Sequence, residues 1–406
     1  MTPLRRTPLT ALVLLTALGL FLPLAAALPA GAAPAPPAHG CASSVPYVSG
    51  LGGYHTYRIP AVVRTRQGTV LAFAEGRRYD ARDTGAIDVV LRRSTDGGCT
   101  WGPLTVVTPG DGDTRGNPAP VVDPRTGAVV LVTCGNSGAA TEGEIMSGEG
   151  ERRVYVQRSR DDGRRFSPPA DITAQVKRSD WRWYATGPGH AVALTRGPHR
   201  GRLLVPANHS VAPPAGSSGS AGSGRDGGHA LYSDDSGRTW HLGFVTDSTR
   251  GVTNVNETTA AQLPDGRLYF NARDQYGSAP GNRLDSYSGD GGRSLDRPYA
   301  RQPSLSDVPV VQGSVLQLRG PGAPLLFSAP SVPTARRALA LWTSTDAGRT
   351  FTKRLTLSDR PAAYSDLVQL GPATVGVLYE TGTAGSYESL EFRRLDVPSL
   401  MPAAGP

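Results

Sequence analysis

Cysteine is scarce in this chain of 406 residues, which contains only Cys41, Cys99 and Cys134. An odd number excludes complete pairing within the chain, and the spacing matches no metal-ligand motif. One disulfide can form if the chain is exported to an oxidising compartment. The sequence does not choose which two cysteines would form it.

Long hydrophobic runs are absent beyond the N-terminus. The run from Leu9 to Leu28 follows the basic pair Arg5-Arg6 and leads into small residues, which is typical of a secretory signal peptide. We therefore expect residues 1–35 to be a signal peptide and processing region, and the protein to be secreted. An uncleaved membrane anchor is the alternative, but the Pro/Ala-rich segment 36–46 that follows favours processing.

Lysine is nearly absent, because only Lys177 and Lys353 are lysines among the 42 basic residues, and the net charge is +8. A basic protein can bind nucleic acid, but the sequence has no helix-turn-helix, zinc spacing or basic run. An acidic small substrate or a polyanionic glycan explains the charge as well.

Patterns for long amphipathic helices are also absent, whereas 50 Gly and 35 Pro indicate a fold rich in tight turns. Five turns share the frame Ser-x-Asp-x-Gly-x-x-aromatic, hereafter the Asp box, with Leu295 replacing the aromatic residue in the fourth copy. The copies begin at Ser94, Ser159, Ser233, Ser288 and Ser344. In each, the Asp side chain can accept bonds from turn N–H groups, and Gly suits a positive φ.

The copies lie 55 to 74 residues apart, which suits a four-stranded blade with variable loops. Short apolar runs such as Val70–Phe73 and Val129–Val132 recur between them, as strands do. We predict an all-β propeller over residues 47–397, with a short tail at 398–406. A Gly/Ser-rich insertion at 211–228 and an exposed acidic loop at 136–151 interrupt it.

The Asp boxes, together with Tyr57-Arg58-Ile59-Pro60, resemble the exo-α-sialidases (neuraminidases) of bacteria and animals. The resemblance covers about residues 50 to 395 and implies a six-bladed β-propeller that holds its substrate at the central axis. The positions that match the family's motifs are Arg58, Asp83 in the loop before the first box, Glu257 in Asn256-Glu257, Arg273 in Asn271-Ala272-Arg273, Arg336 eight residues before the last box, Tyr364 in Ala363-Tyr364-Ser365, and Glu380 in Leu378-Tyr379-Glu380. That spacing selects Arg336 over its neighbour Arg337.

The chemistry of sialic acid calls for the same residue types. Its carboxylate can be held by Arg58, Arg273 and Arg336 through charge-assisted hydrogen bonds. Clustered cations need a buried anionic partner, and Glu380 beside Arg58 is the candidate.

A neutral tyrosine is a better nucleophile here than a carboxylate, because the substrate's own carboxylate would repel a second anion. Sialidases indeed use a Tyr nucleophile. Tyr364 would attack while Glu257 takes its proton, and Asp83 would serve as general acid and then base.

Several assignments keep alternatives open. Asp80 competes with Asp83 for the acid role. Arg77 either helps to bind the substrate carboxylate or pairs with Glu75 or Asp80. The aromatic residues Trp181, Trp183 and Tyr184 either line the pocket or pack within a blade.

The sequence thus predicts a secreted, retaining exo-α-sialidase that removes terminal α-linked sialic acid from glycoproteins, glycolipids or oligosaccharides. We expect it to act as a monomer without cofactor or metal, and without nucleic-acid partners or a membrane span after processing. The alternatives are a glycosidase for a related nonulosonic acid, a trans-sialidase, or a non-catalytic glycan-binding propeller.

Overall fold

The computed structural model describes residues 41–211, 225–247, 253–275 and 282–401. The predicted signal peptide at 1–35, residues 36–40, most of the insertion at 211–228 and the last residues of the tail lie outside these ranges.

Strands form nearly all of the regular structure in the described residues. One sheet has the order β2-β3-β4-β6-β7-β8-β9, with β5 paired to β4. Its strands are β2 (Thr56–Arg64), β3 (Val70–Arg77), β4 (Ile87–Ser94), β5 (Thr105–Thr108), β6 (Thr114–Val122), β7 (Val129–Asn136), β8 (Arg152–Ser159) and β9 (Ala170–Asp171).

The other four sheets have four or five strands each. The first contains β10 (Trp181–Thr186), β11 (Val192–Ala193), β12 (Leu203–Val211), β13 (Arg225–Ser233) and β14 (His241–Val245). The second contains β15 (Val255–Gln262), β16 (Leu268–Asp274), β17 (Arg283–Ser288) and β18 (Ala300–Arg301). The third contains β19 (Ser314–Gln317), β20 (Leu325–Val332), β21 (Ala335–Ser344) and β22 (Thr352–Thr356). The last joins β23 (Ala362–Gly371), β24 (Thr374–Thr381) and β25 (Ser389–Asp396) to the first strand of the chain, β1 (Ser43–Val48).

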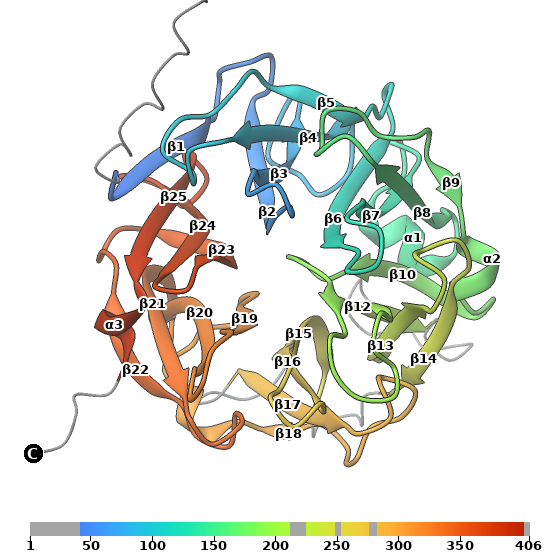
Figure 1. Cartoon of the computed structure of the whole chain (residues 1–406). Helices are drawn as coiled ribbons and strands as arrows, with labels where there is room; N and C mark the ends of the chain where they lie inside the picture. The colour runs from blue at the N-terminus through green and yellow to red at the C-terminus, as the bar shows by residue number, and fades with distance from the viewer. Residues whose placement is uncertain (1–40, 212–224, 248–252, 276–281, 402–406) are drawn as a thin grey trace, which may run out of the picture. The chain divides into compact units, whose positions relative to one another are not determined.

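The sheets follow one another around a common centre, as Figure 1 shows for the described residues. Strand β2 contacts β6 and β23, and the same kind of contact links β12 with β15, β15 with β19, and β19 with β23. Strand β10 contacts β6 and thereby completes the circle of inner strands. The all-β propeller predicted from the sequence is therefore confirmed.

The number of separate sheets differs from the six blades that the resemblance implied. Among the described residues there are five hydrogen-bonded sheets, one of them with eight strands. Within that large sheet, β4 and β6 are joined by one parallel pair, Ile87 with Thr114, whereas all its other pairings are antiparallel. A single pair is enough to merge two units that are otherwise built like the four-stranded sheets.

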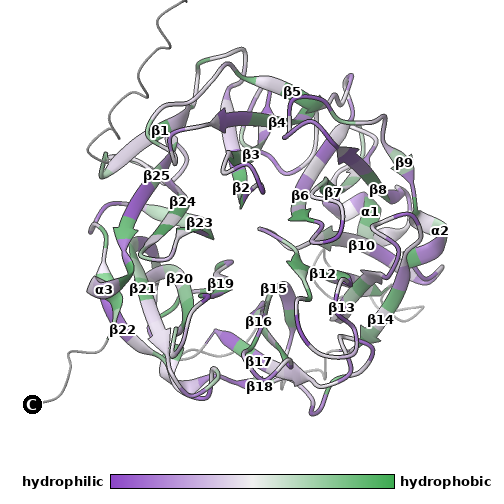
Figure 2. Cartoon of the chain, in the orientation of Figure 1, coloured by the Kyte–Doolittle hydropathy of each residue, from purple (hydrophilic) through white to green (hydrophobic). Residues whose placement is uncertain are grey.

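Apolar side chains fill the space between neighbouring sheets, and strands such as β3 and β7 are buried along their whole length. Figure 2 shows hydrophobic residues on strands all around the circle. One cluster joins Val132 and Val156 of the large sheet to Leu203 and Leu231 of the next. Such contacts fix the sheets against each other and thereby fix the side chains that project from their inner strands.

All five Asp boxes form the same turn, between the third and fourth strands of their units. In the first box, Ser94 Oγ donates to Asp96 at 2.7 Å, and Asp96 accepts the N–H groups of Cys99 and Thr100 at 3.0 and 2.9 Å. Gly98, at φ 92°, donates its N–H to Ser94 Oγ. The predicted role of the box Asp as a turn acceptor is seen in each copy.

The predicted exposed acidic loop contains a short helix, α1 (Glu142–Ser147). Thr141 and Glu144 form a reciprocal capping box, with Glu144 N–H donating to Thr141 Oγ1 at 3.2 Å and Thr141 N–H to Glu144 at 2.7 Å. Ile145 is buried beneath it. The remaining helical segments in the described part of the chain are α2 (Thr173–Val176), η1 (Pro303–Leu305) and α3 (Val397–Leu400).

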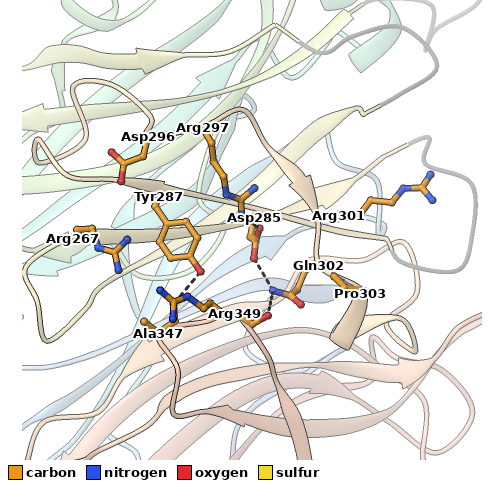
Figure 3. Close-up of a pocket in the computed structure, with 10 residues that line it drawn as sticks. All are labelled: Arg267, Asp285, Tyr287, Asp296, Arg297, Arg301, Gln302, Pro303, Ala347 and Arg349. Atoms are coloured by element: carbon orange, nitrogen blue, oxygen red, sulfur yellow. Dashed lines mark hydrogen bonds and ion pairs between the residues drawn. The ribbon is translucent and has the colours of Figure 1, made fainter.

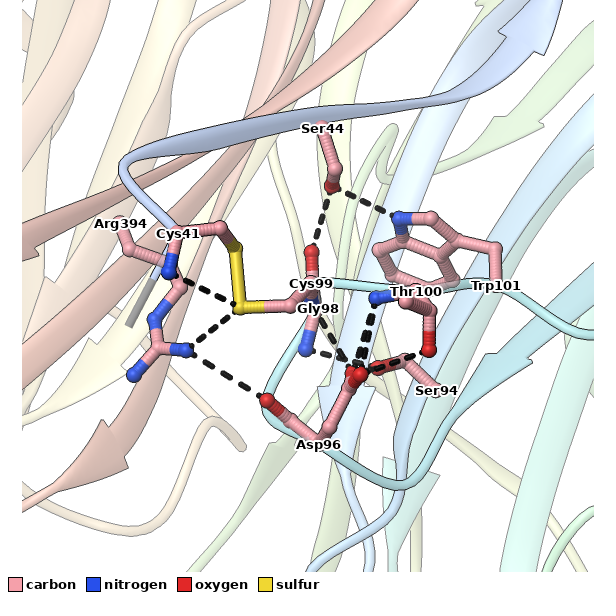
Figure 4. The surroundings of a disulfide bond; sticks show 9 residues. All are labelled: Cys41, Ser44, Ser94, Asp96, Gly98, Cys99, Thr100, Trp101 and Arg394. Carbon is pink, nitrogen blue, oxygen red and sulfur yellow. Dashed lines mark hydrogen bonds between the residues drawn. A yellow bond between two sulfur atoms is a disulfide. The ribbon is translucent and has the colours of Figure 1, made fainter. Parts of the chain in front are cut away.

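A disulfide between Cys41 and Cys99 connects the start of β1 to the first Asp box (Figure 4). Ser44 on β1 adds two bonds to the same turn, accepting from Trp101 Nε1 at 2.8 Å and donating to the Gly98 carbonyl. Because β1 also pairs with β25, this link joins the first sheet unit to the last. Cys134 is free and buried.

Replacing Cys41 and Cys99 together by serine should lower the free energy of unfolding by about 2–4 kcal/mol, because the bond closes a large loop. Urea denaturation of the parent and the double variant measures this. Dithiothreitol should lower the midpoint of the parent and leave that of the variant unchanged. Equal midpoints under oxidising conditions would contradict a stabilising role for this bond.

Candidate active site

Local irregularities in the inner strands lie where the predicted site residues are found. The strand register shifts between Arg58 and Ala61 in β2, between Val255 and Thr258 in β15, and between Ala362 and Ser365 in β23. A bulge bends a strand and redirects its side chains. Here the bulges lie at or beside Arg58, Glu257 and Tyr364.

Arg58 and Glu380 form a buried bidentate ion pair. Arg58 donates from Nε and Nη2 to the two carboxylate oxygens at 3.0 and 3.2 Å. Glu380 also accepts the N–H of Ile59 at 2.9 Å and that of Tyr364 at 3.0 Å. Ile59 has a φ of 55°, a left-handed conformation that is costly for a β-branched residue. Glu380 therefore holds both the Arg58 guanidinium and the backbone of two site strands.

The charge state of Arg58 is secured by that pair. Burial on its own would lower the pKa of Arg58, but the Glu380 carboxylate raises it well above its usual value. The guanidinium also lies 4.0 Å from the centre of the Tyr387 ring and 5.0 Å from that of Tyr364. Tyr387 was not singled out by the sequence, since no motif contains it.

Tyr364, Glu257 and Arg273 form a second connected group. The Tyr364 hydroxyl donates to one oxygen of Glu257, and Arg273 Nη1 donates to the other at 2.8 Å. Arg273 Nη1 also lies 3.4 Å from the Tyr364 hydroxyl oxygen. Burial and the negative charge of Glu257 raise the pKa of Tyr364. The phenol is therefore neutral and already bonded to the group that can accept its proton.

Arg336 approaches the same tyrosine from β21. Its Nη1 donates to the Tyr387 hydroxyl at 3.1 Å and its Nη2 to the Val310 carbonyl at 3.2 Å. The guanidinium lies 5.9 Å from the centre of the Tyr364 ring. Arg337 instead donates to the Asp359 carbonyl. Of the two neighbours, only Arg336 joins the group around Tyr364.

Asp83 reaches the site from the loop between β3 and β4. Arg77 Nη2 donates to Asp83 at 2.7 Å and to Glu75 at 2.6 Å, and Arg58 Nη1 lies 3.7 Å from Asp83. The Asp83 side chain is 58% exposed, whereas that of Arg77 is 2% exposed. Asp80, the competing carboxylate, pairs with Arg82. Of the ion-pair partners that the sequence suggested for Arg77, the structure shows Glu75 and not Asp80. It adds Asp83 as a second partner.

The free protein favours the ionised form of Asp83. Partial desolvation would raise its pKa, but the guanidiniums of Arg77 and then Arg58 lower it below the usual value. The ionised Asp83 carboxylate can accept a proton, but it cannot donate one until the positive charge of Arg77 and Arg58 is offset.

Arg152 is a buried site residue that the sequence did not indicate. It donates to Asn117 Oδ1 at 2.6 Å and to the Tyr184 carbonyl, and it lies 3.9 Å from the centre of the Trp183 ring. Asn117 has a φ of 51° and donates its N–H to Glu75 at 2.9 Å. Since these contacts depend on the bulge between Gly116 and Ala119, no linear motif marks them.

The three aromatic residues that the sequence offered as pocket lining, Trp181, Trp183 and Tyr184, lie in two different environments. Trp181 and Tyr184 are buried in the hydrophobic cluster between two sheets, and Trp181 stacks on His209 with ring centres 3.8 Å apart. Trp183 is half-buried and stacks with Arg152. Of the three side chains, only that of Trp183 contacts Arg152, whereas Tyr184 contacts it through its backbone carbonyl.

The charges of the site are nearly balanced by its own carboxylates. Arg58, Arg77 and Arg273 pair with Glu380, Glu75, Asp83 and Glu257. Arg336 has no carboxylate within ion-pair distance among the described residues. The Arg336 guanidinium donates only to the neutral oxygens of Tyr387 and Val310. An anionic ligand would therefore supply the charged partner that Arg336 lacks.

No group of three or more His, Cys, Asp or Glu residues in the described ranges is arranged to hold a metal ion. The same residues contain no helix long and apolar enough to cross a membrane.

Glu380→Gln should lower the free energy of unfolding by about 3–5 kcal/mol, because it leaves the buried Arg58 without its paired charge. Glu151→Gln is the matched control, since Glu151 is 59% exposed where it pairs with Arg153, and it should change stability by about 0–1 kcal/mol. Urea denaturation compares the two variants. Equal losses would show that the Arg58–Glu380 pair has no special role.

The family model described as a BNR repeat-like domain matches residues 68–377. An exo-alpha-sialidase of Aspergillus fumigatus is 31% identical over 382 residues, covering 86% of each chain. Human sialidase-4 is 30% identical over 441 residues, covering 83% of this chain and 89% of the relative. The sialidase of Micromonospora viridifaciens is 32% identical over 357 residues, covering 84% of this chain but only 52% of that longer protein.

The solved structure of the Hadza microbial sialidase Hz136 superposes with a TM-score of 0.76 at 25% identity, covering 88% of this chain and 69% of that one. The similarity therefore extends over most of the chain. The chain belongs to the sialidase (neuraminidase) family of enzymes with BNR repeats.

Proposed function

We propose that this protein is a secreted, retaining exo-α-sialidase that hydrolyses terminal α-linked sialic acid from glycoproteins, glycolipids or oligosaccharides. The observation that carries the proposal is the bond from the Tyr364 hydroxyl to Glu257, next to Arg58, Arg273 and Arg336. This combination suits a substrate that has a carboxylate on its reacting carbon.

The arginines would bind the carboxylate of the sugar. Arg58 and Arg273 are held in place by Glu380 and Glu257, so little side-chain freedom is lost when the ligand binds. Arg336 would contribute the charge that has no carboxylate partner among the described residues. The anomeric carbon would then lie close to the Tyr364 hydroxyl.

In the first displacement, Tyr364 Oη would bond to the anomeric carbon while the glycosidic C–O bond breaks. Glu257 would take the phenol proton, and Asp83 would give a proton to the leaving oxygen. In the second displacement, Asp83 would take a proton from water as the water oxygen bonds to the same carbon. The Tyr364–carbon bond would break, and Glu257 would return its proton to the phenolate. Two displacements retain the configuration.

Asp83 has to gain a proton before it can act as an acid. The substrate carboxylate would offset the charge of Arg58 and remove part of the field that lowers the pKa of Asp83. Arg77 would continue to pair with Glu75 and orient Asp83. Binding and protonation of the acid would thus be coupled.

Six blades are the unit count that we propose for the fold. The eight-stranded sheet would represent two blades, β2 to β5 and β6 to β9, which share only the Ile87–Thr114 pair. Export is supported by the signal-peptide pattern and by the Cys41–Cys99 disulfide, which is typical of oxidising compartments. We propose that processing removes residues 1–35 and that the mature protein acts as a monomer.

Tyr364→Phe should lower kcat for a fluorogenic α-sialoside by about a hundredfold or more, because the nucleophile is lost while the ring and its packing remain. Release of the fluorophore by purified protein in EDTA measures this, with Tyr155→Phe on β8, the third strand of its unit, as the control. NMR of the first product should show the α-anomer of free sialic acid. An unchanged kcat in Tyr364→Phe would refute the nucleophile, and no release by the folded parent would refute the sialidase.

A further inference from the structure

A polar cavity of about 410 Å³ lies between the sheet of β15 to β18 and the turn of the last Asp box (Figure 3). Its lining consists of Arg267, Asp285, Tyr287, Asp296, Arg297, Arg301, Gln302, Pro303, Ala347 and Arg349. None of these residues belongs to the site around Tyr364. We call this the arginine cavity.

The arginine cavity is separate from the active site. Arg273 lies near the end of β16 and pairs across the sheet with Arg283, whereas Leu268 at its start pairs with Ser288. Arg267 directly precedes β16, six residues before Arg273, so the two guanidiniums project from points about 20 Å apart along the strand. A ligand in one site does not fill the other.

The walls of the arginine cavity are fixed by buried contacts. Gln302 donates to Asp285 at 2.7 Å and to the Gly348 carbonyl at 2.9 Å. The Tyr287 hydroxyl donates to the Ala347 carbonyl at 3.1 Å. The bonds to Gly348 and Ala347 run from one sheet to the Asp box of the next, so the cavity exists before any ligand binds. A preformed cavity reduces the entropy lost on binding.

The lining of the arginine cavity contains more guanidiniums than carboxylates. Asp285 is buried and accepts from Arg297 and Gln302, and Asp296 accepts the Gly289 N–H at 2.8 Å. The lining thus carries four guanidiniums against two carboxylates, and of the two only Asp285 is buried in an ion pair. Arg349 is exposed, and its guanidinium makes no hydrogen bond or ion pair with the described residues. It is the donor that an incoming anion would meet.

Two further guanidiniums are positioned by one aromatic ring. Arg267 and Arg297 lie 5.3 and 5.4 Å from the centre of the Tyr287 ring, which holds them by cation–π attraction. Arg267 also pairs with Asp265 at 2.8 Å and Arg297 with Asp285, but each guanidinium has more N–H groups than these partners use. Arginine forks of this kind suit carboxylate and sulfate groups.

We propose that the arginine cavity is a non-catalytic binding site for an acidic sugar, one that carries a carboxylate or a sulfate group. The volume lies in the range of small-molecule sites, about 300–1,000 Å³, and exceeds what a single inorganic anion fills. Tyr287, Pro303 and Ala347 supply apolar surface for the C–H groups of the ring. The anion contacts Arg349 together with Arg267 or Arg297.

The test is calorimetric titration of the full chain with two probes, a hydrolysis-resistant thio-linked α-sialoside and a sulfated disaccharide, with lactose and inorganic sulfate as controls. The sialoside should show two sites in the parent and one in Arg349→Ala. Arg267→Ala should weaken the second site about tenfold or more. Arg238→Ala is the matched control, because Arg238 occupies the position of Arg349 in the third Asp box and should leave both sites intact.

Turnover of a small fluorogenic sialoside should be unchanged in Arg349→Ala, which separates this cavity from the active site. Second-site binding of only the sialoside or only the sulfated sugar supports the proposal and identifies the source of the anion. Three results would overturn it. They are one sialoside site together with no binding of the sulfated disaccharide, a sugar site outside the active site that survives in both Arg349→Ala and Arg267→Ala, or a site lost in Arg349→Ala that binds inorganic sulfate but neither sugar.

Discussion

The hydrogen bond between the Tyr364 hydroxyl and Glu257 joins two residues that are 107 positions apart in the sequence. A phenol is a weak nucleophile at neutral pH, and burial raises the pKa of this one further. Proton removal by Glu257 is therefore the step that would make Tyr364 reactive. The bond forms only because the closed circle of inner strands brings β15 and β23 to the same pocket, and because a bulge lies at each residue.

Repulsion among the guanidiniums of the site destabilises the folded protein. Carboxylates that are buried or bonded on several sides offset this repulsion. The main one is Glu380, which pairs with Arg58 and also accepts two backbone N–H groups. Removing one partner from such a pair is expensive, because a charge is left buried and unpaired. Arg336 lacks a carboxylate partner among the described residues, and this leaves the pocket complementary to an anionic ligand.

Much of the architecture could be predicted from the sequence, because the Asp box is a local feature. Its Ser, Asp and Gly make their bonds within eight residues, so five copies in frame predict a repeated β unit. The site residues Arg58, Asp83, Glu257, Arg273, Arg336, Tyr364 and Glu380 could be named from family motifs, and the structure brings them together. Their catalytic roles remain predictions.

The features that could not be predicted from the sequence depend on contacts between residues far apart in the chain. Tyr387 stacks with Arg58, and Arg152 bonds to Asn117, but neither residue lies in a motif. The bulges and the positive φ of Ile59 arise from pairing between strands, which a linear pattern does not specify. The choice of Cys41 and Cys99 for the disulfide also required β1 to pair with the last sheet.

The most direct test of the central claim is to trap the covalent intermediate. The parent protein is incubated with a 3-fluorosialyl fluoride, digested, and its peptides are weighed by tandem mass spectrometry. We predict one added fluorosialyl group, located on Tyr364. A label on Asp83 or Glu257, or turnover of the reagent with no labelled peptide at any time, would contradict nucleophilic attack by Tyr364.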